Sequence, residues 1–200
     1  MRAVPDSIAE GLERAAAVFA DRGFDQTRIE DLAEATGVPR ATLYYYFTGK
    51  EDILAWLLRR MLAANAEAVA GAAAGPGSAR ERLEAVVLAK LEVSARNPDA
   101  CRALWADFGR AGRIPDLAAA VQAGWHAPVR RLLADGEADG SLRPVADPET
   151  TAAAIYGAVT IAAAHYLFAD NRLDAQRVAA ALCPLLFKGL EPAEVDTLKT

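Results

Sequence analysis

The apolar residues of this chain recur with the period of an α-helix. Their spacings of three and four place them on single helical faces, and no segment alternates in the manner of a β-strand. Two examples are Leu83, Val87 and Leu91, and Val178, Leu182, Leu185 and Leu186. We therefore predict an all-α fold.

Several helix starts can be located from capping patterns. In Ser/Thr-x-x-Glu the hydroxyl accepts from a free backbone N–H while the glutamate reaches back to the cap. The pattern occurs at Ser7/Glu10, Thr27/Glu30, Thr48/Glu51 and Ser78/Glu81. Further starts are predicted at Asn97-Pro98, Pro115 and Asp147-Pro148, and helix ends at Gly37, Gly140 and Gly189.

The spacing of these signals divides the chain near Thr48. Short helices precede this residue, and a helix of about twenty residues follows it. We predict one domain over residues 1–48 and a second, larger domain over residues 49–200.

The first domain contains the pattern of a helix-turn-helix. Leu32 and Ala33 give the second helix a small apolar face, Gly37 allows a left-handed turn, and Leu43 and Phe47 seat the third helix. The complementary stripe on the first helix consists of Ile8, Leu12, Ala15, Phe19 and Phe24.

Three consecutive tyrosines lie in the third helix of this domain. With Leu43 and Phe47 facing the core, Tyr45 points about 180° away, and Tyr44 and Tyr46 lie about 80° to either side. This geometry suits a helix in the major groove of DNA, where outward residues meet bases and the flanks meet phosphates. In the alternative, the two flanking tyrosines pack partly into the domain and only Tyr45 is exposed.

Charges near the tyrosines favour the same interpretation. The net charge of −5 and the pI near 5.1 argue against a generally basic nucleic-acid-binding surface, but a local site remains possible. Thr27 and Arg28 stand at one predicted helix start and Lys50 at another, where free N–H groups favour a phosphate. Arg40 has the chemistry to contact guanine.

The segment from Phe24 to Leu58, with TRIEDLAEATGVPRATLYYYFTGKEDIL, resembles the DNA-binding domain of the TetR family of bacterial transcriptional repressors. The resemblance implies a homodimer of about nine helices per chain, with a small DNA-binding domain, called the reader below, and a larger ligand-binding and dimerising domain. By position it implies phosphate contacts from Thr27, Tyr44, Tyr46 and Lys50. It also implies contacts near the bases, from Arg28, Arg40, Ala41, Thr42 and Tyr45. Pro39 stands where the family often has Ser, so a hydroxyl contact is absent there.

Two helices near the C-terminus are predicted to form the dimer interface. Small residues allow close helix approach, and larger apolar residues add contact area. The predicted interface consists of Ile155, Val159, Ala163, Tyr166, Leu167, Val178, Leu182, Leu185 and Leu186. In the alternative, the same faces fill the core of a monomer.

Aromatic and flexible apolar side chains in the middle of the chain predict a pocket for a small, mostly apolar effector. The candidate lining residues are Trp56, Met61, Leu104, Trp105, Phe108, Trp125, His126, Tyr156 and Thr160. Each of these residue types is also common in a plain core. We further expect effector binding to displace the long helix that carries Lys50.

Other functions are less well supported by the residues. Residues 150–169 carry no charge over a membrane-spanning length, but their alanine-rich composition favours a buried helix. Cys101 and Cys183 show no disulfide or zinc pattern, and we expect no cofactor, no metal and a cytoplasmic location. An enzyme would use His126 or His165 with a carboxylate or Cys101, and no such residues cluster in the sequence.

We therefore predict a ligand-responsive repressor, without enzymatic activity, that binds a near-palindromic double-stranded operator as a dimer and is released by its effector. The alternative is a helical carrier or sensor of small molecules that does not bind DNA. The tyrosine triplet together with Arg40 and Lys50 argues against the carrier.

Overall fold

A computed structural model describes residues 3–106 and 116–188. Within these ranges the chain is helical and contains no β-strand, which confirms the all-α prediction. The predicted helix start at Pro115, the helix end at Gly189 and the pocket candidate Phe108 lie outside the described residues.

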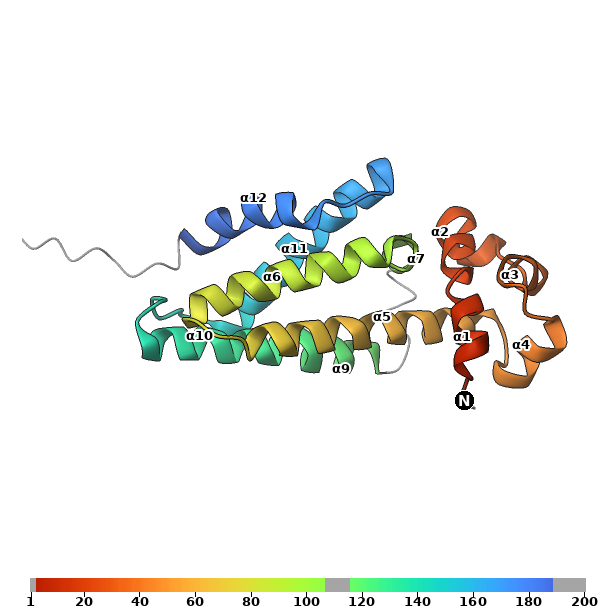
Figure 1. Cartoon of the computed structure of the whole chain (residues 1–200), viewed down its shortest axis with the longest axis horizontal. Helices are drawn as coiled ribbons and strands as arrows, with labels where there is room; N and C mark the ends of the chain where they lie inside the picture. Colours follow the sequence, from red (N-terminus) through yellow and green to blue (C-terminus); the bar gives the residue numbers. More distant parts are fainter. Residues whose placement is uncertain (1–2, 107–115, 189–200) are drawn as a thin grey trace, which may run out of the picture.

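Helices α1 to α4 form a compact N-terminal unit at one end of the molecule, and the remaining helices after α5 form an elongated body (Figure 1). The N-terminal unit consists of α1 (Asp6–Leu12), α2 (Ala15–Gln26), α3 (Ile29–Thr36) and α4 (Arg40–Tyr46). Helix α5 (Lys50–Ala73) leads from this unit into the body. The body contains α6 (Ala79–Arg96), α7 (Pro98–Ala106), α9 (Leu117–Val121), the π-helical turn η1 (Gln122–His126), α10 (Ala127–Asp139), α11 (Pro148–Asp170) and α12 (Ala175–Phe187).

The N-terminal unit is built on the predicted apolar stripe. Leu12 and Phe19 are fully buried, and the Phe24 ring stacks on Phe19 with centroids 6.1 Å apart. The helix itself is interrupted, because α1 ends at Leu12 and Gly23 adopts a positive φ of 73° near the end of α2. The stripe thus survives although its residues do not belong to one continuous helix.

Hydrogen bonds at the helix starts confirm some predicted caps and shift others. At Ser78 the capping box forms as predicted, and the Asp147 carboxylate accepts from the N–H groups of Glu149 and Thr150. At α3 the box lies one residue later than predicted, because Asp31 accepts from the Arg28 N–H. At α5 no capping box forms, since Gly49 is the N-cap and the Thr48 N–H and hydroxyl donate to Asp52 instead of pairing with Glu51. The predicted cap at Ser7 is wrong, since α1 already begins at Asp6 after Pro5.

Helix α5 belongs to the cores on both sides. Its first turns, including Leu54 and Leu58, pack with the N-terminal unit, while Val69 lies in the core of the body. The predicted division between residues 48 and 49 stays a prediction. In packing terms, α5 is shared by the two parts.

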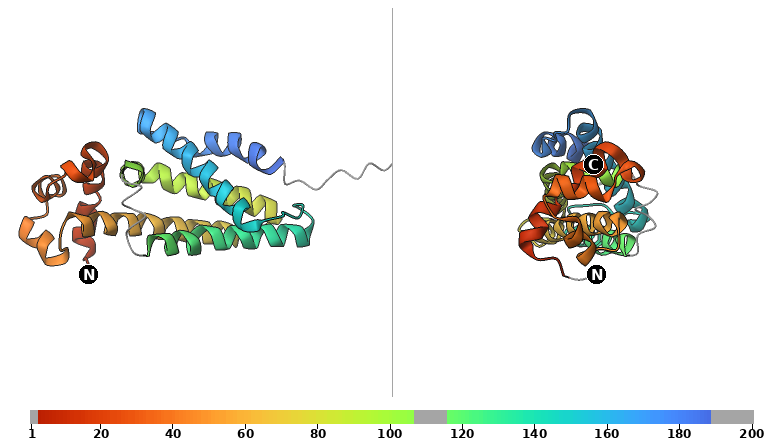
Figure 2. Two further views of the ribbon diagram at one scale, coloured as in Figure 1. Left: turned by 180° about the vertical axis from the view of Figure 1, so that it is seen from behind. Right: turned by 90° about the vertical axis from the view of Figure 1, so that its right-hand side faces the viewer.

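Helix α6 lies in the middle of the body and contacts α5, α10, α11 and α12. Figure 2 shows α11 crossing the body diagonally, with α12 beside it. By length and composition α11 could cross a membrane, but here Ile155, Val159 and Leu167 bury their side chains against neighbouring helices.

Candidate nucleic-acid interface and ligand pocket

The turn between α3 and α4 fixes the direction of the tyrosines. Gly37 ends α3 with a φ of 70°, and Arg14 donates to the carbonyls of Ala35 and Thr36 at the same helix end. Leu43 and Phe47 are buried, so α4 is seated as the spacing predicted. The opposite face of α4 is therefore directed outward.

Tyr44 and Tyr45 form the exposed aromatic surface of α4. They are 53% and 59% exposed, which confirms the outward direction predicted for Tyr45. Tyr46 is half-buried, packs against the N-terminal core and meets the Tyr45 ring edge-on at 4.9 Å. The structure thus agrees partly with each interpretation of the triplet, because one flanking tyrosine is exposed and the other is packed.

The remaining candidates for base contact lie around the start of α4. Ala41 is exposed and Thr42 is half-buried on its first turn. Arg40 is exposed and forms an ion pair with Glu30 at 2.7 Å, while Arg28 is exposed at the start of α3. Exposed ion pairs contribute little to stability, so DNA can replace the Arg40–Glu30 contact at small expense.

Two predicted phosphate contacts have internal partners. The Lys50 ammonium donates to the carbonyls of Phe24, Asp25 and Thr27 at 2.7, 3.2 and 2.8 Å. Thr27 is 1% exposed, and its hydroxyl donates to the Gly23 carbonyl at 2.7 Å. Lys50 therefore fastens the loop between α2 and α3 to the start of α5, a role that sequence spacing did not indicate.

In the body, three of the predicted pocket residues come together. The Tyr156 ring lies 5.6 Å from Trp125 and 5.6 Å from His126, measured between ring centroids. Thr160 follows one turn after Tyr156 on α11. Trp125 and His126 belong to η1, and π-helical turns occur often at functional sites.

The other pocket candidates lie elsewhere. Trp56 packs edge-on against Phe47 in the core of the N-terminal unit. Met61 is buried beside Cys101, with the two sulfur atoms 3.5 Å apart, and Leu104 packs at the same place. Trp105 is half-buried on α7. The structure therefore corrects the idea that all of these residues line one pocket.

Sequence reasoning missed Lys90, which lies at the centre of the cluster. Lys90 is 7% exposed, and its ammonium lies 4.8 Å from the centroid of the Tyr156 ring and 5.8 Å from that of Trp125. Burial lowers the pKa of Lys90 to about 8. The signal was present, because Lys90 interrupts the apolar stripe that includes Leu83, Val87 and Leu91.

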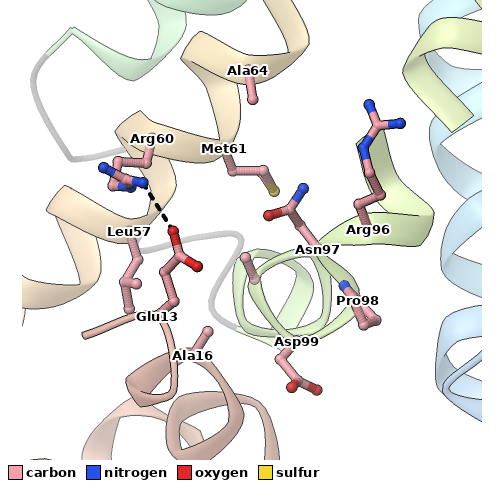
Figure 3. A pocket seen from close by; sticks show the side chains of 11 residues that line it. Glu13, Ala16, Leu57, Arg60, Met61, Ala64, Arg96, Asn97, Pro98 and Asp99 are labelled. Atoms are coloured by element: carbon pink, nitrogen blue, oxygen red, sulfur yellow. Dashed lines mark hydrogen bonds and ion pairs between the residues drawn. The ribbon is translucent and has the colours of Figure 1, made fainter. Parts of the chain in front are cut away.

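A cavity of about 340 Å³ lies apart from the Lys90 residues, where the N-terminal unit meets the body (Figure 3). Arg60 of α5 and Glu13 form an ion pair across it at 2.9 Å, and Met61 and Arg96 also line it. Nearby, Arg102 of α7 joins Asp99 to Asp21 of α2. These contacts connect the N-terminal unit to the body near the first turns of α5.

The structure corrects part of the predicted dimer interface. Five of its residues are buried within one chain, as the monomer-core alternative described, namely Ile155, Val159, Ala163, Leu167 and Val178. Tyr166, Leu182 and Leu186 are half-buried, and Leu185 is 77% exposed. The outward faces of α11 and α12 present Leu185, which was predicted, together with Ile161 and Phe168, which were not.

The described histidines and cysteines do not come together as a metal or catalytic group would require. Over residues 3–106 and 116–188, the His, Cys, Asp and Glu side chains form no group of three suited to a metal ion. His126 is buried in η1, whereas His165 is exposed on α11 and its ring meets Tyr166 edge-on.

Two family descriptions match the chain. The description of bacterial regulatory proteins of the tetR family matches residues 12–57, and that of the C-terminal part of BetI-type transcriptional repressors matches residues 79–187. The second match alone covers more than half of the chain.

Individual relatives are similar over different lengths. The HTH-type transcriptional repressor KstR2 of Mycobacterium tuberculosis is 43% identical over 53 residues, which are 26% of this chain and 26% of KstR2. This match therefore spans about a quarter of that relative. The fatty acid metabolism regulator protein of Bacillus subtilis is 20% identical over 180 residues, which are 90% of this chain and 93% of that protein.

Solved structures share the fold of the whole chain. The ketosteroid regulator KstR2 of Mycobacterium tuberculosis has a TM-score of 0.78 at 23% identity, over 95% of this chain and 97% of its own. FadR of Bacillus subtilis, in complex with stearoyl-CoA, has a TM-score of 0.75 at 20% identity, over 92% and 99%. AibR, in complex with isovaleryl coenzyme A and operator DNA, has a TM-score of 0.70 at 21% identity, over 91% and 98%.

Proposed function

This chain belongs to the TetR family of bacterial transcriptional regulators, and we propose that it is a cytoplasmic, homodimeric repressor without enzymatic activity. Each protomer reads half of a near-palindromic operator with α4, and a small, mostly apolar effector releases the dimer. The observation that carries this proposal is the outward pair Tyr44 and Tyr45 on a helix whose opposite face is locked into the core by Leu43 and Phe47.

The reader binds DNA through a division of roles. A helix in the major groove directs its outermost residues to base edges, which assigns Tyr45, Thr42 and Ala41 to the bases. Tyr44 lies on the flank of α4 and contacts a phosphate. Arg28 adds a second phosphate contact from the start of α3, where the helix dipole also favours an anion.

The effector is proposed to carry an acyl group. Two relatives of the same fold were solved with acyl coenzyme A compounds, stearoyl-CoA and isovaleryl coenzyme A. In this chain, the Trp125 and Tyr156 rings supply an apolar wall and Lys90 a hydrogen-bond donor that suits an acyl oxygen.

Helix α5 transmits the signal. Through Asn65 it borders the cavity that Lys90, Trp125 and Tyr156 line, and through Leu54 it enters the N-terminal core. A shift of α5 in the body therefore moves the reader and changes the separation of the two α4 helices. An effector that prefers the released form by about 100-fold shifts the equilibrium by roughly 2.7 kcal/mol per site.

Replacement of Tyr45 by alanine tests the reader. We expect operator affinity to fall roughly 5- to 150-fold, because the substitution removes base contacts worth about 1–3 kcal/mol. Binding is measured by fluorescence anisotropy at a fixed salt concentration, on DNA that flanks the gene for this protein and on fragments selected from random sequence.

Arg131→Ala serves as the control, since it changes an exposed residue of α10 far from α4. This variant should retain operator affinity. If the folded wild-type protein selects no DNA sequence, with or without acyl compounds, the carrier alternative replaces the repressor.

A further inference from the structure

Lys90 is a buried cation without an acidic partner among the described residues. It lies in the middle of α6, and no salt bridge to Asp or Glu is formed within 4.0 Å there. Its observed neighbours are the faces of the Trp125 and Tyr156 rings. A buried lysine is normally paired, because removing the ammonium group from water is unfavourable. Lys90 therefore lacks the counter-charge that its location calls for.

Further polar atoms near Lys90 are also unpaired. Asn65 Oδ1 on α5 and His126 Nδ1 on η1 are buried and accept no hydrogen bond within the described part of the chain. Buried polar atoms are nearly always satisfied in a complete structure. Asn65 thus brings an unsatisfied oxygen to the same cavity as the Lys90 cation, and the His126 ring lies beside Tyr156, which lines that cavity.

A small cavity of about 20 Å³ lies at this place, bordered by Lys90, Asn65, Trp125 and Tyr156. Helix α5 and η1 close tightly over it, because a Cβ atom on Gly124 would lie only 2.8 Å from the Ala66 Cβ. A ligand larger than a water molecule must therefore separate α5 from η1 when it binds.

We propose that Lys90 binds the carboxylate of an acidic effector, whose apolar body lies against the rings of Trp125 and Tyr156. This inference rests on the proposed function in so far as it uses the same pocket, and it narrows the ligand from an acyl compound to a free carboxylic acid. Entry of the acid parts α5 from η1, which connects binding to the helix that carries the reader.

Charge decides between a free acid and a thioester. A neutral acyl oxygen gives Lys90 one hydrogen bond, whereas a carboxylate also supplies the missing charge, and charge-assisted hydrogen bonds are about twice as strong. The affinity for an acid should then depend on the protonation of Lys90. Among residues 3–106 and 116–188, the other titratable groups near Lys90 are Tyr156 on α11, Cys101 on α7 and His126 on η1. Burial raises the pKa of Tyr156 and of Cys101, which keeps both neutral at physiological pH.

Calorimetric titration of the full-length protein without DNA tests the proposal. The probes are short and medium straight-chain carboxylates, benzoate and phenylacetate, together with the primary amide and the coenzyme A thioester of each. We expect at least one carboxylate to bind at least about tenfold more tightly than its amide and its thioester. Between pH about 7.5 and about 9.5 its affinity should fall roughly 10- to 30-fold, as Lys90 loses its proton.

Two variants show whether Lys90 is responsible. Lys90→Met should abolish the preference for the acid and its pH dependence, whereas His126→Gln should retain the pH dependence. Circular dichroism confirms that each variant is folded. The proposal is overturned if no carboxylate binds, if acid and amide bind equally, or if Lys90→Met keeps the preference.

The calorimetric titration also distinguishes failure of the carboxylate proposal from failure of the proposed function. Tight binding of a thioester with no binding of the free acid would leave an acyl effector in place and reject the carboxylate. Failure of operator binding would leave the calorimetric result unaffected, because the titration contains no DNA.

Discussion

Lys90→Met is expected to stabilise the protein against unfolding by about 2–3 kcal/mol at neutral pH. Burial lowers the pKa of Lys90 from 10.5 to about 8. Each pKa unit corresponds to about 1.36 kcal/mol, so the folded state carries a penalty of roughly 3 kcal/mol for the buried charge. Methionine fills a similar volume without a charge, although it gives up the contacts of the ammonium with two aromatic rings.

The penalty depends on pH in a defined direction. Below pH about 8 Lys90 is charged in both states, so the full penalty applies. Between about 8 and 10.5 the unfolded chain binds more protons than the folded chain, and the free energy of unfolding rises with pH. Wild type should therefore gain up to about 3 kcal/mol over this range relative to Lys90→Met, whose advantage disappears at high pH.

Urea denaturation of both proteins at neutral and alkaline pH measures this difference. The Cys101 thiol interacts electrostatically with the Lys90 charge, so both proteins are compared in a Cys101→Ala background, which isolates Lys90. Lys188→Met, which replaces an exposed lysine after α12, is the control and should leave stability nearly unchanged. A gap between wild type and Lys90→Met that is absent, or that is constant with pH, would show that the Lys90 charge is stabilised by a partner.

The same residue shows why function and stability conflict at this site. An unpaired charge and unsatisfied polar atoms destabilise the free protein, and a ligand that satisfies them binds more tightly for that reason. The expected gain in stability on replacing Lys90 and the expected loss of acid binding thus have one physical origin.

The direction of the tyrosines could be predicted because local spacing determines it. Once Leu43 and Phe47 face the core, the 100° rotation per residue leaves Tyr45 outside. The hydrogen bonds of Lys50 could not be predicted from local spacing, because the carbonyls of Phe24, Asp25 and Thr27 lie more than twenty residues away in sequence. Only the packed fold brings these carbonyls to the start of α5.

The exact cap residues and the buried face of α11 are two further features that the sequence pattern did not determine. Asp31 and Asp52 accept hydrogen bonds where a glutamate one residue earlier was predicted, since acids adjacent in sequence satisfy the same pattern one register apart. Helix α11 is apolar on all sides, so its sequence does not reveal which stripe faces α6 and which faces outward. The burial of Val159 and the exposure of Phe168 required the tertiary structure.

Replacing both Phe168 and Leu185 by aspartate is expected to convert the proposed dimer into monomers. These residues are 56% and 77% exposed on α11 and α12, and Ile161 of α11 is also exposed. Large apolar side chains exposed on neighbouring helices mark an interaction site, and we propose that a second copy of the chain covers them, because closed two-fold symmetry pairs a surface with itself. Burying two carboxylates against their symmetry mates would oppose association, since each would be desolvated next to a like charge.

Loss of the dimer should weaken operator binding more than loss of Tyr45 does. When two readers are joined, the second half-site is bound at a high effective concentration, which raises affinity by roughly 10²- to 10⁴-fold. Sedimentation velocity gives the oligomeric state, and anisotropy on full operators and half-sites gives the affinities. The double variant should bind a half-site and a full operator about equally well.

Ala134→Asp places the same charge on an exposed position of α10 and should remain dimeric. Circular dichroism separates dissociation from unfolding, because Phe168 and Leu185 contribute little to the core of one chain. A double variant that still sediments as a dimer would move the interface away from α11 and α12. Another surface would then set the separation of the two α4 helices. The effect of an α5 shift on that separation would have to be derived again from the new interface.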